Sequence, residues 1–449
     1  MIHKQSICCA ALCWAVLAYT GLAPLPRRKA ALSLLPLTAV PSAAPAASVE
    51  RITGKVASNP AKTSSGQYYR FTLALTRVSG RRGTLRIDSG AKGPVTVLFP
   101  TELMEANFPG KLYSAAQSRA RKTGGGVPDV PLEAGVILTV RGKILPPPED
   151  RSGGFARLTS QSITFLAETA ENAAYEETFY GRLEKFRGLC RLAFRRLMYA
   201  WGDAGGLFLA LVSGASEYTN KDISGRFRAA GLAHVLAISG MHLALFSGIM
   251  RRASQKTGKQ VSEILSVMAV LVFVWFAGFT PSLRRALIFF LLGLFAKRTG
   301  KRPGMTELLA ATFCIHYFMA PEELFSLSFI LSYTGLAGIF VLSGPAHRLL
   351  ARIPCCYPAN DIASSAGALL ATSPVTAIFW GCVTPAGLLS TPAVTPLVSV
   401  FMIAGLLCAA LSLLVPALLF PLGAVMNALY RCIAGLVRIF AQIPQIILR

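Results

Sequence analysis

The chain has 449 residues, of which 53% are hydrophobic and 15% are charged. Because an average soluble domain carries about 25% charged residues, this composition argues against an ordinary soluble enzyme. The charges are also unequal, with 45 Lys and Arg against 21 Asp and Glu and a net charge of +24. A long, apolar and basic chain of this kind predicts an integral membrane protein with basic loops.

Residues 1–48 are predicted to form an N-terminal membrane hairpin. The apolar run Ser6–Leu25 is followed by the basic residues 27–29, and a second uncharged run then continues to Ser48. Each run is about long enough to cross a bilayer, and the basic turn suits the cytoplasmic side. A cleaved signal peptide is the alternative, since residues 44–46 (Ala-Pro-Ala) could serve as a processing site.

Residues 49–170 are predicted to form an all-β domain of the OB type. Apolar and polar residues alternate in residues 69–76, 83–87, 94–99 and 136–141, which is the pattern of half-buried strands. A helix is expected near residues 111–122. Five or six short strands with one helix suit a small Greek-key barrel.

Residues 171–228 are predicted to form amphipathic or interfacial helices. In residues 181–199, apolar side chains recur at steps of three and four, while basic side chains occupy mostly other faces. Two interpretations remain open: the helix lies in a membrane interface, or it packs on its own protein with a solvated basic face. The next apolar segment, 204–215, is short for a span and fits a re-entrant or interfacial segment better.

Residues 229–449 are predicted to be almost entirely membrane-embedded. The basic loops 251–259 and 297–302 enclose two apolar segments, so both loops can be cytoplasmic. This topology puts the β domain outside and predicts a polytopic α-helical membrane protein with an inserted external OB-like domain. The predicted spans are residues 229–250, 261–280, 284–296, 305–320, 324–343, 362–380, 384–417 (broken or double as an alternative) and 420–443.

Two groups of polar residues interrupt the predicted spans. Arg284 and Arg285 follow a non-cytoplasmic turn, and charge inside a membrane by default faces a cavity or a polar partner; the alternative is that both snorkel to the surface. His234, Ser239 and His242 share one apolar segment. A metal site there lacks further ligands, a serine nucleophile with a histidine base needs more support, and polar packing between helices is the third interpretation.

Cysteine and histidine usage predicts no cofactor and no metal. None of the ten cysteines forms a CxxC pair, and most lie in or beside apolar runs. The sequence also lacks a GxxxxGK[ST] phosphate loop. We therefore expect any energy source or nuclease to belong to other proteins.

Three motifs resemble those of the ComEC competence-protein family. Residues 227–242, FRAAGLAHVLAISGMH, are similar to the family segment aGlaHllAiSGlH. Residues 278–286, GFTPSLRRA, are similar to GfspSxxRA and map the motif arginine onto Arg285, while residues 325–329, FSLSF, are similar to FqLSF with serine in place of glutamine. Residues 373–375 and 392–396 match more loosely, and the asparagine usual before the last block is missing.

The resemblance implies a multi-pass channel in the bacterial inner (cytoplasmic) membrane that takes up single-stranded DNA in natural transformation. It implies a short form, because the metallo-β-lactamase-like domain of many members has no counterpart here. The expected partners are single-stranded DNA, membrane lipids, a separate nuclease, a cytoplasmic DNA-translocating ATPase and a second copy of the chain. The implied channel residues are His234, Ser239, Gly240, His242, Arg285 and Ser328.

Weaker candidates for contact with DNA lie in the β domain, where basic and aromatic side chains could bind phosphates and stack on bases. They are Tyr68, Tyr69, Tyr113, Arg119, Arg121 and Lys122. We expect no catalytic residues. The alternatives are an intramembrane hydrolase or metal-dependent enzyme that uses Ser239 with His234 or His242, and a structural relative that has lost transport.

Overall fold

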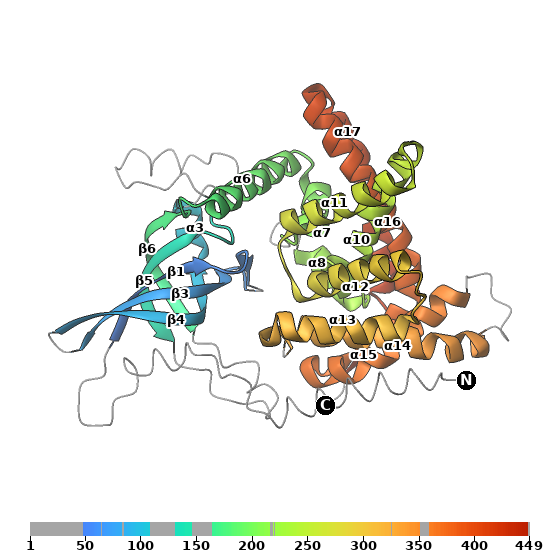
Figure 1. The fold of residues 1–449 in the computed structure, drawn as a ribbon, viewed down its shortest axis with the longest axis horizontal. Coiled ribbons are helices and arrows are strands. Elements are labelled where there is room, and N and C mark those ends of the chain that lie inside the picture. Colours follow the sequence, from blue (N-terminus) through green and yellow to red (C-terminus); the bar gives the residue numbers. More distant parts are fainter. Residues whose placement is uncertain are drawn as a thin grey trace. The chain divides into compact units, whose positions relative to one another are not determined.

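The computed structural model describes residues 48–63, 65–82, 85–107, 131–145, 164–215, 219, 221–324, 326–350 and 359–447. These residues divide into two compact units (Figure 1). We call residues 48–199 the barrel unit and residues 200–447 the helical unit. The predicted N-terminal hairpin, up to residue 47, and the predicted helix near 111–122 lie outside the described residues.

The barrel unit contains a sheet whose strands close into a ring. Strand β1 pairs with both β3 and β5, which closes the order β1-β5-β6-β4-β3. All neighbours in this ring are antiparallel except β4 and β6, which are parallel. The elements are β1 (Ser48–Val56), β2 (Ala61–Lys62), β3 (Tyr68–Arg82), β4 (Leu85–Pro100), α3 (Thr101–Asn107), β5 (Ile137–Leu145) and β6 (Thr164–Ala174).

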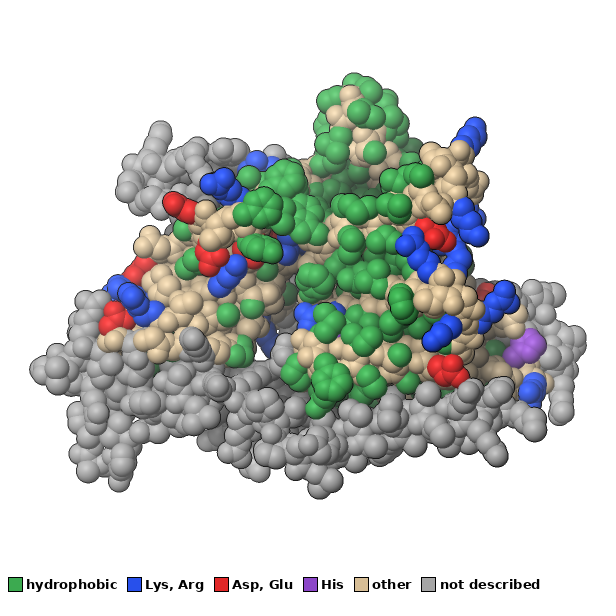
Figure 2. Space-filling view, viewed as in Figure 1, with side chains coloured by type: hydrophobic (Ala, Val, Ile, Leu, Met, Phe, Trp, Pro, Cys, Tyr) green, Lys and Arg blue, Asp and Glu red, His purple; other side chains and the backbone are tan. Residues whose placement is uncertain are grey.

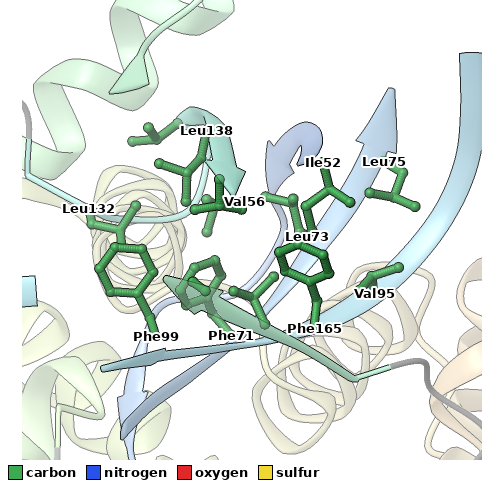
Figure 3. Packing of buried hydrophobic residues seen from close by; sticks show 14 of the residues in the cluster. Ile52, Val56, Phe71, Leu73, Leu75, Val95, Phe99, Leu132, Leu138 and Phe165 are labelled. Atoms are coloured by element: carbon green, nitrogen blue, oxygen red, sulfur yellow. The ribbon is translucent and has the colours of Figure 1, made fainter. Parts of the chain in front are cut away.

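Alternation of side chains along the strands builds the barrel core (Figure 3). Phe71, Leu73 and Leu75 on β3 point inward with Phe99 of β4 and Phe165 of β6, and all five are at most 4% exposed. Successive residues of a strand face opposite sides, so this period of two produces the buried face. The segments 83–87 and 94–99, predicted as separate strands, overlap one 16-residue strand, β4.

Helix α6 (Phe179–Tyr199) belongs to the barrel unit and packs on it through polar side chains. Arg191 donates from Nε to the Glu133 carboxylate at 3.0 Å, and Arg195 pairs with the same carboxylate. Glu133, Arg191 and Arg195 are 2%, 3% and 7% exposed. The alternative of a fully solvated basic face is therefore wrong for these two arginines, because a buried carboxylate draws them toward the sheet.

The helical unit begins with short helices and continues with long ones. Its helices are α7 (Gly202–Ser213), α8 (Lys221–Ala229), α9 (Ala233–Leu236), α10 (Gly240–Ala253), α11 (Lys259–Ala277), α12 (Pro281–Arg298), α13 (Met305–Met319), α14 (Leu327–Leu350), α15 (Ala359–Trp380), α16 (Gly387–Leu414) and α17 (Leu419–Phe440). The 3-10 turn η3 (Pro321–Glu323) joins α13 to α14. The alternative of a broken or double span within 384–417 is wrong, since α16 runs unbroken through Pro392 and Pro396.

Five segments of the described helices are long and apolar enough to cross a membrane. Hydrophobic side chains cover much of the visible surface of the helical unit (Figure 2), as expected for helices that face lipid instead of water. The protein is thus mostly helical, with a smaller barrel-like sheet. The five segments are Lys259–Ala277, Leu327–Arg348, Asn360–Trp380, Gly387–Leu414 and Pro416–Phe440.

Candidate functional site

The predicted span 229–250 is not one helix but is broken just before Gly240. Helix α9 ends at Leu236, Ala237 is extended, and Ser239 is the extended N-cap of α10. The Ser239 backbone N–H donates to Nδ1 of His242 at 3.1 Å, which closes a capping box. A capping box satisfies the unpaired N–H groups at a helix start, so these polar residues stabilise a helix terminus within an apolar segment.

The Ser239–His242 pair is arranged as a helix cap. Ser239 Oγ lies 3.3 Å from Nδ1 of His242, but the lone pair of this nitrogen already accepts the Ser239 backbone N–H. Nε2 of His242 is buried and has no hydrogen-bond partner among the described residues. A catalytic histidine needs its lone pair free for the nucleophile and its other nitrogen held by a third group.

The start of α10 packs against α12, the helix that carries Arg285. A Cβ atom added at Gly240 would lie 3.5 Å from Cβ of Ala286, an ordinary van der Waals distance, so the two helices are in contact at this point. The broken helix and Arg285 are therefore neighbours. His234 lies on α9, before the break, and its side chain is exposed.

Arg285 is buried in the second turn of α12. Pro281 begins this helix, and Thr280 caps it by accepting the Leu283 N–H at 3.3 Å. The Arg285 side chain is 6% exposed, donates to the carbonyl oxygen of Ser332 at 3.1 Å and lies 5.9 Å from the ring centroid of Tyr333. Its Nε has no hydrogen-bond partner among the described residues, so a buried cation keeps an unused donor.

Arg284 lies next to Arg285 in the same polar region, together with Glu323, His316 and Tyr333, which the sequence analysis did not identify. Arg284 pairs with Glu323 at 3.1 Å, and Glu323 accepts from Nε2 of His316 at 3.0 Å. Nδ1 of His316 lies 3.2 Å from the Tyr333 hydroxyl, and His316 is fully buried. The rule that singled out Arg285, an ionisable residue inside an apolar segment, would also have found His316, whereas Glu323 lies in the turn between two predicted spans.

Ser328 lies beside the same region. Its hydroxyl is 3.0 Å from that of Ser282 in the first turn of α12. We call Ser282, Arg284, Arg285, His316, Glu323, Ser328 and Tyr333 the polar cluster.

The polar cluster gathers at one end of three helices. It comprises residues of the N-terminal turns of α12 and α14, of the C-terminal turn of α13 and of the 3-10 turn η3. The basic residues at the other end of α12 form a different set of contacts, in which Lys297 pairs with Glu263 of α11 at 2.7 Å. If the basic loops are cytoplasmic, as the positive-inside rule predicts, the polar cluster lies toward the outer side.

Of the residues predicted to contact DNA, only two lie in the described part of the barrel unit, and one of these is buried. Tyr69 is 7% exposed and lies in the core, so its ring cannot stack on a base. Tyr68 points away from the core and is partly exposed. Tyr113, Arg119, Arg121 and Lys122 lie outside the described residues.

A comparison with known families matches the part of the chain that contains these residues. Residues 211–448, which include the broken helix and the whole polar cluster, match the family model described as Competence protein. The chain belongs to the competence protein family. Neither a curated protein nor a solved structure was found to match it. Competence membership and five long apolar helices together indicate a multi-pass membrane protein with a role in DNA uptake for transformation.

Proposed function

We propose that this competence protein forms the channel through which single-stranded DNA crosses the bacterial inner membrane. The observation that carries the proposal is buried Arg285, with an unused donor, among seven polar residues at one end of apolar helices. Arginine binds phosphate through several N–H donors and stays charged. The free donor of Arg285 can therefore offer a DNA phosphate a hydrogen bond that lipid cannot supply.

The barrel unit is proposed to collect the strand outside the membrane. A ring of five strands with a single parallel pair supports an OB-type barrel, a fold that often binds single strands. Tyr68 is the remaining aromatic candidate among the described residues. The further proposed partners are a separate nuclease, a cytoplasmic DNA-translocating ATPase and a second copy of the chain.

Binding of single-stranded DNA to the full chain is expected to weaken as salt rises. With three phosphates neutralised, affinity falls about 40-fold between roughly 50 and 300 mM salt, because counterions are released on binding. Fluorescence anisotropy of a labelled oligonucleotide with the detergent-solubilised protein measures this dependence. A peptide nucleic acid of the same sequence, which lacks phosphate charge, is the control; equal binding of both would contradict a phosphate-binding role.

Uptake by cells tests the channel directly. Cells that lack the gene should bind labelled DNA at the surface but accumulate no DNase-resistant single strands, and a plasmid copy should restore accumulation. Surface binding serves as the internal control, since it requires only steps that precede the channel. Normal accumulation in the deletion strain would contradict the proposal.

The chain is proposed to transport without catalysing a reaction. The Ser239–His242 geometry supports this view, because the histidine lone pair is occupied by a backbone N–H. Among the described residues, no group of three or more His, Cys, Asp or Glu side chains is placed to hold a metal ion.

A further inference from the structure

Helix α6 exposes several of its large apolar side chains. Phe179, Leu183 and Phe186 are 77%, 39% and 58% exposed, and their spacing of four and three places them on one face. The buried side of α6 contains Arg191 and Arg195 together with the apolar residues Leu192 and Met198. An ordinary surface helix buries its phenylalanines and exposes its arginines, whereas α6 exposes two phenylalanines and buries two arginines.

Specific polar contacts fix this orientation. Besides the pairs of Glu133 with Arg191 and Arg195, Glu184 pairs with Lys55 of β1 at 2.9 Å and Arg187 donates to Asn59 at 3.0 Å. Burial lowers the pKa of Arg187 to about 10, and burial also raises the pKa of nearby Tyr175 to about 12. Rotating α6 to hide its phenylalanines would break all of these contacts, so the apolar face stays outward.

Gly188 brings α6 close enough to make these contacts. A Cβ atom at this position would lie 2.4 Å from the Tyr175 hydroxyl oxygen, so a larger residue would displace either the Tyr175 side chain or the helix. The glycine at this position and the polar contacts therefore indicate the same orientation of α6 on the barrel.

The exposed charges of α6 are cationic. Arg182, Lys185 and Arg196 are exposed beside the apolar face, whereas Glu184, the one acid of α6, pairs with Lys55. Figure 2 shows hydrophobic and basic side chains side by side in the region of α6, at the upper left. An apolar face flanked by Lys and Arg suits the surface of a bilayer that contains anionic lipids.

The position of α6 in the chain also favours lipid. Only Ala200 and Trp201 separate α6 from α7, the first helix of the helical unit. Trp201 is fully buried, and its Nε1 donates to the carbonyl oxygen of Leu419 in α17, one of the segments long enough to span a membrane. The C-terminal end of α6 is thus tethered within a few residues of a membrane helix.

We propose that α6 lies on the lipid surface, with Phe179, Leu183 and Phe186 inserted among the acyl chains and Arg182, Lys185 and Arg196 at anionic headgroups. The buried Glu133 pairs then connect this anchor to the barrel. The barrel unit is therefore held at the bilayer surface by α6 as well as by its covalent link to α7. Anchoring of the barrel unit by α6 does not depend on whether the protein transports DNA.

Photocrosslinking of the full chain in vesicles tests the anchor. The photoreactive residue p-benzoylphenylalanine replaces Phe186 in one protein and the exposed Thr76 of β3 in another, and both are reconstituted in phosphatidylcholine vesicles with or without phosphatidylglycerol. The expected result is a lipid adduct at position 186 and little at position 76, detected by mass spectrometry. A crosslink at position 186 to a second chain or to the helical unit, or no lipid adduct, would overturn the proposal.

A charge variant tests the headgroup contact separately. In Arg182→Gln/Lys185→Gln, the preference of the adduct at position 186 for phosphatidylglycerol should fall about fivefold or more, since each cation near an anionic surface adds to binding. The adduct with phosphatidylcholine should remain, because the apolar face is unchanged. An unaltered lipid preference in this variant, with a normal elution profile, would overturn the role of these cations.

Discussion

Replacing Arg285 with glutamine is expected to lower DNA uptake about 10- to 100-fold, because a charge-assisted contact contributes about 1.5–3 kcal/mol and each 1.4 kcal/mol is a factor of ten. Glutamine keeps a hydrogen-bond donor for the Ser332 carbonyl but removes the charge and the Nε–H. The measurement is accumulation of DNase-resistant labelled DNA, normalised to the amount of protein in the membrane.

Two further variants make the Arg285 result specific. Lys297→Gln removes a cation from the same helix but outside the polar cluster, where Lys297 is exposed and paired with Glu263, and should leave uptake nearly unchanged. Arg285→Lys keeps the charge but not the planar donors, and should fall between the wild type and Arg285→Gln. Normal uptake by an abundant Arg285→Gln protein would remove this residue from the mechanism.

Gly231→Ala is expected to destabilise the helical unit by about 3 kcal/mol, since a left-handed residue with a Cβ costs about 1–2 kcal/mol and overpacking adds about 1–3 kcal/mol. Gly231 has φ of 75°, and an added Cβ would lie 2.8 Å from Cα of Gly387 at the start of α16. The neighbouring Ser390 hydroxyl donates to the Ala230 carbonyl at 2.6 Å and locks the same contact.

This loss of stability is measured by heating the detergent-solubilised protein and monitoring its unfolding by size-exclusion chromatography. Gly225→Ala in α8 is the matched control, because a Cβ there meets nothing within 4 Å and alanine is a better helix former than glycine. The control should unfold at the wild-type temperature or slightly above it. If Gly231→Ala did the same, the close contact between residue 231 and α16 would be refuted.

Local sequence patterns predicted the type of each secondary-structure element better than how the elements pair and pack. Alternation identified strands, but it split β4 into two segments, because only pairing along β3 shows that residues 85–100 form one strand. Periodicity identified α6 as amphipathic but could not orient it. Its orientation depends on Glu133, which lies 58 residues before Arg191 in the chain.

The site shows the same division between local and distant information. Arg285 stands out locally as a charge in an apolar segment, whereas the link from Arg284 through Glu323 and His316 to Tyr333 requires α12, η3, α13 and α14 to meet. Tyr69 illustrates the opposite error, since an aromatic residue near basic ones suggested stacking on DNA. The pleat of β3 turns its ring into the core.

The most direct test of the central claim is whether DNA in transit touches the polar cluster. The photoreactive residue p-benzoylphenylalanine would replace Ser328 in the cluster or Phe318 on α13, which is 81% exposed. Position 318 lies two residues from His316 and therefore points to nearly the opposite side of α13. Illumination during uptake of labelled DNA should crosslink DNA at position 328 and not at position 318. Crosslinking at position 318 alone, or at neither position in cells that take up DNA, would contradict a path along the polar cluster.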